Sequence, residues 1–413
     1  MVKKKFEDFV NTKNQDVFSK AFELNAYLQE NPEKMLSGLG LKMQGPAAPN
    51  TVLLDDAEHE VIMLGSNSYL NLTTHPDVVA ASKAACEKYG YGMGAVSLYA
   101  GITELHRELE IAIADFYSTE DAIVFPSGYG TNIGVISAIC NHDDIIINDS
   151  ANHSSIFDGS VLSGATLKIY LHRDMKKLEH VLSRIDRKGR GVLIITDGVF
   201  SMHGDLAPLD EIVSLAEKYD ARVMVDDAHG IGIVGPGGRG TAAAFGVRDK
   251  IDLNIGMLSK APGGLGGFCA AKKEIVDYLR LYARSYFFST ALPAPIVAGL
   301  LEVFKLLKAN AAGRNQLWDN INYLKSRLIA AGFNTGESAS GIIPIIVGDE
   351  VALAGFHRDL IDNGVYTNIV SYPALRRKES RVRLCVMSSL TTQQMNKALS
   401  VIMQAGKKWQ IIK

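Results

Sequence analysis

The stretch NIGMLSKAPGGLGGF, residues 254–268, carries a single lysine among apolar and very small residues. This lysine, Lys260, has no charged neighbour within several positions on either side. A small apolar pocket lowers the pKa of an amine, so that the uncharged, nucleophilic form becomes available. The stretch therefore predicts an amine that attacks a carbonyl group, and the following glycines would leave room for a cofactor and a substrate. Taken alone, such a lysine is more often a snorkelling side chain.

Other polar residues also follow apolar runs that are typical of strands. In VMVDDAHG, Asp226 ends such a run and His229 stands three residues later. In IITDGVFSMHGD, Asp197 and Ser201 follow another run. Ligands of open parallel sheets bind beyond the carboxyl ends of the strands. We therefore expect these side chains to meet Lys260 at one edge of a sheet.

The stretch VFPSGYGTN joins a strand to a helix through a turn that contains Gly128 and Tyr129. The free backbone N–H groups of such a turn form a natural seat for a phosphate. An amine, a carboxylate and a phosphate seat on one sheet edge are what pyridoxal 5'-phosphate requires. That cofactor needs an amine for a Schiff base and a carboxylate facing its pyridinium nitrogen. The sequence therefore predicts a pyridoxal-phosphate site.

Each of these residues also has a structural interpretation. Either Asp226 or Asp227 could cap a loop, while His153 and His229 could be structural histidines or, together, metal ligands. No spacing of histidine, cysteine and carboxylate supports a metal, so no metal site is predicted. GPGGRG, residues 235–240, matches G-x-G-x-x-G, but no ribose-binding acid follows it in the expected strand–helix–strand context. We interpret it as a turn.

The elements that must position these residues alternate along the middle of the chain. Nearly continuous apolar runs predict strands, and amphipathic helices such as 76–89 and 209–220 lie between them. This alternation predicts a mainly parallel sheet with helices on both faces. From about residue 296 the pattern changes to two helices followed by short strands, which predicts a smaller α+β domain. The six predicted strands of the sheet are 121–125, 144–148, 167–171, 191–196, 222–226 and 252–257. The later elements are helices 295–310 and 315–331 and strands near 342–347 and 381–386.

The overall composition, with 47% apolar and 21% charged residues, is that of an ordinary soluble globular protein. A length of 413 residues exceeds what one hydrophobic core usually serves. The net charge of −2 argues against a nucleic-acid partner. Four widely separated cysteines indicate a reducing compartment. No apolar stretch approaches the roughly 18 residues of a transmembrane segment, and the first residues lack the apolar core of a signal peptide. Lys3, Lys4 and Lys5 are expected to be a solvated start of a helix. We expect a cytoplasmic protein without a transmembrane segment.

From about Phe6 to its end, the chain resembles the α-oxoamine synthases. The stretches that carry this resemblance are GSNSYLNL, HSSIFDGS, TDGVFSMHGDLAPL, VMVDDAHGIGIVGPGGRGT, LSKAPGGLGGF and FFSTALP. The resemblance implies an α/β protein of the pyridoxal-phosphate-dependent transferase fold, type I. Its large cofactor-binding domain, 61–295, would hold a mainly parallel seven-stranded sheet. A smaller α+β domain, 296–413, would pack with an N-terminal segment, 1–60.

The resemblance also implies roles around the cofactor ring. Lys260 would hold the cofactor as a Schiff base and later move protons at the substrate Cα. Asp226 would pair with the ring nitrogen, and His153 would stack on the ring face. His229 and Ser201 would contact the phenolic oxygen of the ring.

The phosphate would lie against the backbone of Gly128 and Tyr129. Ser289 and Thr290 of a second subunit would help to hold it. Met257 stands where the family usually has a threonine phosphate ligand, and Ser259 would compensate for that loss. Members of the family are homodimers with shared active sites, and we expect the same here.

The carboxylate of the amino-acid substrate would be bound by Asn67 and Arg383. The planar fork of an arginine matches a carboxylate. In ESRVRLC, the alternation of a strand predicts that Arg381 faces the opposite side of the strand from Arg383. Three further departures from the family stand at Ala95–Ser97 on the acyl side, at His203 in place of an acidic residue, and at Leu390 in place of a histidine.

The reaction implied is the decarboxylative condensation of an amino acid with an acyl-CoA or acyl-carrier-protein thioester. Stretches such as LGSNSYLNLTT resemble bacterial serine palmitoyltransferases, which favours serine, with glycine or alanine possible, and a role in sphingolipid metabolism. The alternatives within the family are 2-amino-3-ketobutyrate CoA ligase and 8-amino-7-oxononanoate synthase. An aminotransferase or decarboxylase would use the same fold for other chemistry. A non-catalytic subunit is the third alternative, which Met257 and Leu390 favour and Lys260, Asp226 and His229 oppose.

Overall fold

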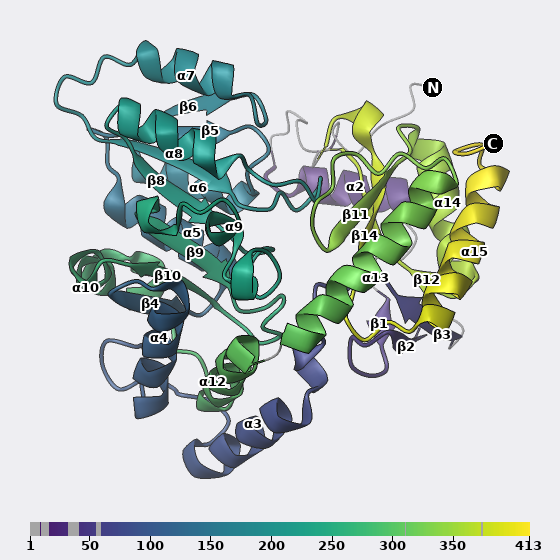
Figure 1. The fold of residues 1–413 in the computed structure, drawn as a ribbon, viewed down its shortest axis with the longest axis horizontal. Helices are drawn as coiled ribbons and strands as arrows, with labels where there is room; N and C mark the ends of the chain where they lie inside the picture. Colours follow the sequence, from purple (N-terminus) through teal and green to yellow (C-terminus); the bar gives the residue numbers. More distant parts are fainter. Residues whose placement is uncertain (1–8, 10–15, 32–40, 55–58, 310, 373–374) are drawn as a thin grey trace.

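A computed structural model shows a large sheet with its helices and a smaller part that joins the two ends of the chain (Figure 1). The structure describes residues 9, 16–31, 41–54, 59–309, 311–372 and 375–413. The predicted lysine cluster at residues 3–5, and much of the predicted segment 1–60, lie outside the described residues.

The large sheet has seven strands in the order β4-β10-β9-β8-β7-β5-β6. Only β10 runs against its neighbours, so the expected seven-stranded, mainly parallel sheet is confirmed. Each of the six predicted strands is present, and its bounds lie within one residue of the prediction. The missed strand, β10, has the sequence GFCAA, whose small residues carry little strand signal. The strands are β4 Asp121–Phe125, β5 Ile145–Asp149, β6 Thr166–Tyr170, β7 Val192–Asp197, β8 Arg222–Asp226, β9 Leu253–Met257 and β10 Gly267–Ala271.

Both faces of this sheet are covered by helices, which explains why its strands are apolar without alternation. In β5, Ile146 packs into one layer with α5 and α6, whereas Ile145 and Ile147 pack into the opposite layer with α7 and α8. The helices around the sheet are α4 Glu104–Tyr117, α5 Gly128–Ile139, α6 Ser154–Ser163, α7 Met175–Ser183, α8 Leu209–Lys218, α9 Thr241–Ala244, α10 Lys273–Tyr282 and α11 Arg284–Phe287. Short 3₁₀ turns lie at Pro236–Gly238 and Arg248–Lys250.

The smaller part contains the sheet β11-β14-β13 and a second sheet, β1-β2-β3-β12. In the second sheet, β12 from the end of the chain pairs in parallel with β3 from its beginning. The smaller C-terminal domain is therefore confirmed, while its limits at residues 60 and 295 stay a prediction. The strands are β1 Lys42–Met43, β2 Asn50–Leu54, β3 His59–Met63, β11 Ile342–Ile346, β12 Val365–Tyr366, β13 Asn368–Val370 and β14 Arg381–Cys385. The other described helices are α2 Ser19–Glu30, α3 Pro76–Tyr89, α12 Ala294–Ala309, α13 Ala311–Ala330, α14 Glu350–Asp362 and α15 Thr392–Lys408, with 3₁₀ turns at Leu72–Thr74 and Arg377–Glu379. Of these, α12 packs against α3 and against α4 of the large part. None of the described helices is long and apolar enough to cross a membrane.

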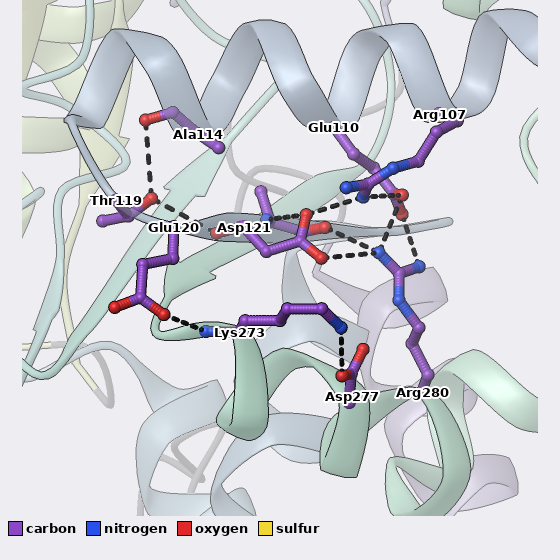
Figure 2. Close-up of polar contacts among 10 residues, drawn as sticks. Arg107, Glu110, Ala114, Thr119, Glu120, Asp121, Lys273, Asp277 and Arg280 are labelled. Carbon is purple, nitrogen blue, oxygen red and sulfur yellow. Dashed lines mark hydrogen bonds and ion pairs between the residues drawn. The ribbon is translucent and has the colours of Figure 1, made fainter.

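A cluster of charges fastens α4 and α10 to the edge strand β4 (Figure 2). The carboxylate of Glu110 accepts two hydrogen bonds from Arg280, at 2.9 and 2.8 Å, and one from Arg107. Arg107 also donates to Asp121 at 2.6 Å, and Arg280 donates to the carbonyl of Ala122. Glu110 is buried. Because Arg280 makes two of its hydrogen bonds to Glu110, removal of this carboxylate would leave the guanidinium without its main partner.

We predict that Glu110→Ala lowers the free energy of unfolding by about 3 kcal/mol, because breaking a buried ion pair leaves an uncompensated charge. Lys273→Ala is the matched control, since Lys273 and Asp277 form an exposed pair on α10. Exposed pairs contribute at most about 1 kcal/mol. Urea unfolding of the three proteins checks this expectation. Equal losses in both variants would contradict the structural role of Glu110.

A second charged cluster lies where the large sheet meets the smaller part. The two nitrogens of His172 lie 3.1 Å from a carboxylate oxygen of Asp149 and 3.0 Å from one of Asp205. Burial lowers the pKa of His172, but the two carboxylates outweigh burial and raise it to about 9. Arg173 links Asp205 to Glu337 of the smaller part. The imidazolium therefore neutralises two carboxylates.

This cluster predicts a pH-dependent contribution to stability. The folded pKa of about 9 lies above the ordinary value of 6.5, so the contribution is complete below pH 6.5 and is lost as the pH rises through 9. We expect the difference in unfolding free energy between the wild type and His172→Gln to be about 2–3 kcal/mol at acidic to neutral pH. It should shrink above pH 9. The exposed His180 on α7 supplies the control His180→Gln. A difference that grows with pH would contradict the cluster.

Candidate active site

A cavity of about 160 Å³ opens at the carboxyl ends of the parallel strands. Its lining includes most of the residues that the sequence singles out, and these come from loops after β4, β5, β7, β8 and β9. The predicted residues that line it are Gly128, Tyr129, His153, Ser201, Asp226, His229, Ser259 and Lys260. The remaining lining residues are Ser155, Asp197, Val199, Ala228 and Met257.

Lys260 lies in the turn between β9 and β10. Burial lowers the pKa of its amine, and the nearby carboxylates of Asp226 and Asp197 oppose that effect only in part. The glycines after it serve the turn itself. A Cβ on Gly263, whose φ is +75°, would lie 2.8 Å from the backbone of Thr73, so the expected room for a cofactor is filled there by protein.

Asp226 ends β8 with both carboxylate oxygens engaged. One oxygen accepts from the backbone N–H of Ala228 at 3.0 Å, and the other accepts from the side-chain amide of Asn132 at 2.7 Å. Asp197 ends the neighbouring strand β7 in register with Asp226. Burial, and next the charge of Asp226, raise the pKa of Asp197 well above its usual range. Two carboxyl groups thus lie side by side in the cavity wall.

The two predicted histidines are held as neutral rings. His153 caps α6, and its Nδ1 accepts from the backbone N–H of Ser155 at 3.3 Å and lies 2.8 Å from the Ser155 hydroxyl. Nδ1 of His229 lies 2.8 Å from the hydroxyl of Tyr69. Burial lowers the pKa of His153 and, more strongly, that of His229.

The predicted phosphate seat is the N-terminus of α5, which begins at Gly128 on the cavity wall. The helix dipole and free N–H groups at such an end favour an anion. Met257 lies directly beneath this turn, because a Cβ on Gly128 would come within 2.1 Å of the Met257 sulfur. Ser259 and Tyr129 line the opening and are exposed. Met257 therefore supports the turn by packing where a hydroxyl was expected.

Asn67 and Arg383 lie together just behind the cavity wall. Arg383 donates to the side-chain oxygen of Asn67 at 3.2 Å and to the carbonyl of Ser201 at 3.0 Å. The expectation that Arg381 faces the other way is wrong. Residues two apart in a strand share a face, and Arg381 donates to the carbonyl of Met202, next to the acceptor of Arg383.

Ser289 and Thr290 do not line the cavity of their own chain. Thr290 instead pairs with Val96, and Ala291 donates to the carbonyl of Ala95. The segment that departs from the family at Ala95–Ser97 therefore lies beside these two residues. Their contact with a second subunit's phosphate stays a prediction.

Two further sequence features have structural explanations. GPGGRG forms a turn, as expected. The next residue, Thr241, donates its backbone N–H and its hydroxyl to the carboxylate of Asp227. A Cβ on Gly240 would fall 1.8 Å from that carboxylate, which explains the glycine. Leu390 is buried in the core of the smaller part, and its carbonyl accepts from Asn320.

Three residues that touch the predicted ones were not singled out. Asn132 and Ser155 stand inside the motifs VFPSGYGTN and HSSIFDGS, and Tyr69 stands inside GSNSYLNL. Asn132 and Tyr69 contact predicted residues that are distant in the sequence, whereas Ser155 contacts His153 two positions away. Only the place of each residue inside a motif could have drawn attention to it.

Comparisons with known proteins agree with this geometry. Residues 59–402 match the family model described as aminotransferase class I and II. The chain is 43% identical over 370 residues to an 8-amino-7-oxononanoate synthase of Thermoanaerobacter pseudethanolicus, covering 90% of this chain and 93% of that protein. It is 38% identical over 402 residues to a 4-hydroxy-2,2'-bipyrrole-5-methanol synthase of a Serratia strain. The match covers 97% of this chain but only 61% of the Serratia protein's length.

Solved structures show the same likeness. A serine palmitoyltransferase from S. paucimobilis superposes with a TM-score of 0.92 and 32% identity, covering 96% of this chain and all of that one. A serine palmitoyltransferase of Sphingomonas wittichii superposes with a TM-score of 0.91 and 31% identity, with the same coverage. The chain belongs to the aminotransferase class I and II family and, within it, to the α-oxoamine synthases.

Proposed function

We propose that the protein catalyses the pyridoxal-phosphate-dependent, decarboxylative condensation of an amino acid with an acyl thioester, giving an α-amino ketone and CO2. The observation that carries this proposal is the convergence of Lys260, Asp226 and two neutral histidines on one cavity. Its relatives of known activity support condensation over transamination.

The residues present fit pyridoxal 5'-phosphate. The cofactor has an aldehyde, a basic ring nitrogen and a phosphate, and the cavity offers an amine, a buried carboxylate and a helix N-terminus. Lys260 would hold the aldehyde carbon, Asp226 would face the ring nitrogen, and the backbone at Gly128 and Tyr129 would hold the phosphate. The solved serine palmitoyltransferase of S. paucimobilis carries a pyridoxal-phosphate adduct, which supports this assignment.

When bound, the cofactor supplies a ring that accepts electrons from the substrate Cα. The chain's own residues then govern protons and orientation. Burial keeps the amine of Lys260 ready to take the α-proton and to return one later. His153 offers a flat, neutral face against the ring. Ser201 and His229 both line the cavity, and His229 is held by the hydroxyl of Tyr69. Both would donate to the phenolic oxygen.

The carboxylate that leaves as CO2 would be held by Arg383 and Asn67. Both are already oriented in the free protein, because Arg383 is fixed by Asn67 and by the carbonyl of Ser201. A guanidinium held in this way can present its remaining N–H groups to an incoming carboxylate.

Serine is the favoured amino acid, on the likeness to serine palmitoyltransferases. Alanine is the second candidate, because the identity to 8-amino-7-oxononanoate synthases is higher. The acyl donor would be a thioester of CoA or of a carrier protein. The longer Serratia protein is named as a 4-hydroxy-2,2'-bipyrrole-5-methanol synthase, so a product of that kind is a third candidate. We further propose a cytoplasmic homodimer in which Ser289 and Thr290 reach the partner's phosphate, and a role in sphingolipid synthesis if serine is the substrate.

We predict that Lys260→Ala abolishes condensation, with kcat falling on the order of a thousandfold or more, because the residue both holds the cofactor and moves the α-proton. The measurement is amino-acid-dependent release of free thiol from the acyl thioester. Lys273→Ala, a change at an exposed lysine on α10, is the control and should keep wild-type turnover. Condensation at a normal rate in Lys260→Ala would refute the assignment.

We predict that the purified protein with pyridoxal 5'-phosphate shows a visible absorption band that one amino acid shifts saturably. Serine, alanine and glycine are titrated separately, and thiol release is then followed with long-chain and short-chain acyl-CoA. Saturation by serine with thiol release supports the serine palmitoyltransferase-like reaction, and saturation by alanine supports the second candidate. Loss of the band with an amino acid alone, together with formation of a keto acid, would identify an aminotransferase instead.

A further inference from the structure

Asn132 connects two residues of the proposed cofactor site that lie on different elements. It stands in the second turn of α5 and is fully buried. Its side-chain amide donates one hydrogen to Asp226 at 2.7 Å and the other to the hydroxyl of Ser155 at 2.8 Å. The reverse orientation of the amide would place its oxygen against a carboxylate oxygen of Asp226, and the two would repel. The observed orientation, with the NH2 group toward Asp226, is therefore the favoured one.

The direction of the hydrogen bonds continues from Asn132 to His153. The backbone N–H of Ser155 can only donate, so Nδ1 of His153 must accept and carries no proton. The Ser155 hydroxyl accepts from Asn132, and its own hydrogen is therefore free to point to Nδ1 of His153. The proton of the neutral ring must then lie on Nε2. The backbone N–H of Ser155 thus fixes the tautomer of His153, and the Ser155 hydroxyl, held by the amide of Asn132, adds a second donor to Nδ1.

The same amide also distinguishes Asp226 from its neighbour Asp197. The two carboxyl groups end adjacent strands in register and both line the cavity. Two buried carboxylates this close cannot both stay ionised without a large cost. Asp226 receives bonds from Ala228 at 3.0 Å and Asn132 at 2.7 Å. For Asp197 the contact is a longer one, 3.4 Å from the backbone N–H of His153.

The other charged groups around the pair do not reverse this preference. Lys260 faces both carboxyl groups, and Asp149 adds a further negative charge on the side of Asp197. Asp227 lies on the side of Asp226, where burial first raises its own pKa to about 7. The pKa of Asp197 is raised well above its usual range by burial first and by Asp226 second. The charge-assisted bond from Asn132 is therefore the feature that singles out Asp226.

We propose that Asn132 is a positioning residue that places the negative charge of the Asp197–Asp226 pair on Asp226. This inference rests on the proposed function, because it assumes that Asp226 faces the ring nitrogen of pyridoxal 5'-phosphate. With the charge on Asp226, the ring nitrogen keeps its proton. Without the amide, Asp197 competes for the charge, and the ring nitrogen is less protonated.

The test uses nitrogen-15 NMR of the holoenzyme loaded with ring-labelled pyridoxal 5'-phosphate, which reports the protonation of the ring nitrogen directly. Asn132→Leu keeps the size of the side chain and removes both donors. We expect its ring nitrogen to shift toward the unprotonated value at neutral pH. We expect kcat to fall about 10- to 100-fold, the factor for losing one hydrogen bond to a charged group. Asn148→Leu is the matched control, since Asn148 is equally buried and donates to Ser160 away from the cavity.

Ser155→Ala is a second variant that does not depend on the stability of Asn132→Leu. It keeps the bond from Asn132 to Asp226, so the ring nitrogen should stay protonated. It also keeps the backbone N–H that donates to Nδ1 of His153, so the imidazole nitrogens, followed in protein labelled at histidine, should still show the proton on Nε2. A ring nitrogen that loses its proton in Ser155→Ala would overturn the assignment of the charge to the bond from Asn132.

A wild-type ring-nitrogen signal in Asn132→Leu, or an equal change in Asn148→Leu, would overturn the proposal that Asn132 places the charge on Asp226. These outcomes differ from a failure of the proposed function. If the wild-type protein gave no signal from bound cofactor, or if Asp226→Ala left the ring nitrogen unchanged, the proposed function would fail and this inference with it.

Discussion

Parallel strands that run in register end at the same edge of a sheet, and every polar group of the cavity depends on that edge. β5, β7, β8 and β9 are hydrogen-bonded neighbours, so the residues that follow them come together although they are far apart in the sequence. The described strands of the large sheet are mainly apolar, with few buried polar residues such as Asn148 and Asn254. Polar side chains therefore gather mainly where the strands stop, and the cavity forms there.

Burial at this edge sets the protonation of each group in the direction that the chemistry needs. It lowers the pKa of the amine and of both histidines, and it raises that of Asp197. Asp226 is the carboxylate of the pair that accepts the shorter hydrogen bonds, from Asn132 and Ala228. The resulting site contains a well-bonded carboxylate, two neutral rings and an amine that gives up its proton more readily than usual.

Most of the large sheet and of the cavity could be predicted from the sequence, because the signals are local. An apolar run followed by a polar residue predicts a strand end, and Lys260, Asp226 and Ser201 were found in this way. The roles of Asn132, Ser155 and Tyr69 could not be predicted, because each acts through a side chain that only the folded chain brings near. The face of Arg381 was misjudged although strand geometry alone decides it. β10 was missed because four of its five residues are small and carry little strand signal. Its Phe268 packs over Gly256 of β9, a contact that only the folded sheet makes visible.

The pairing of β3 with β12 sets the order in which the site can be completed during synthesis. The residues that would hold the cofactor, from Gly128 to Lys260, belong to the large sheet and its loops, and they are synthesised before Arg383. The hydrogen bond between Asn67 and Arg383 joins residues 316 positions apart, so it cannot form until Arg383 has been synthesised. β14 reaches its place only when Cys385 bonds to the carbonyl of Leu64. Such long-range contacts form late, so a nascent chain acquires its cofactor pocket before it can grip a substrate carboxylate.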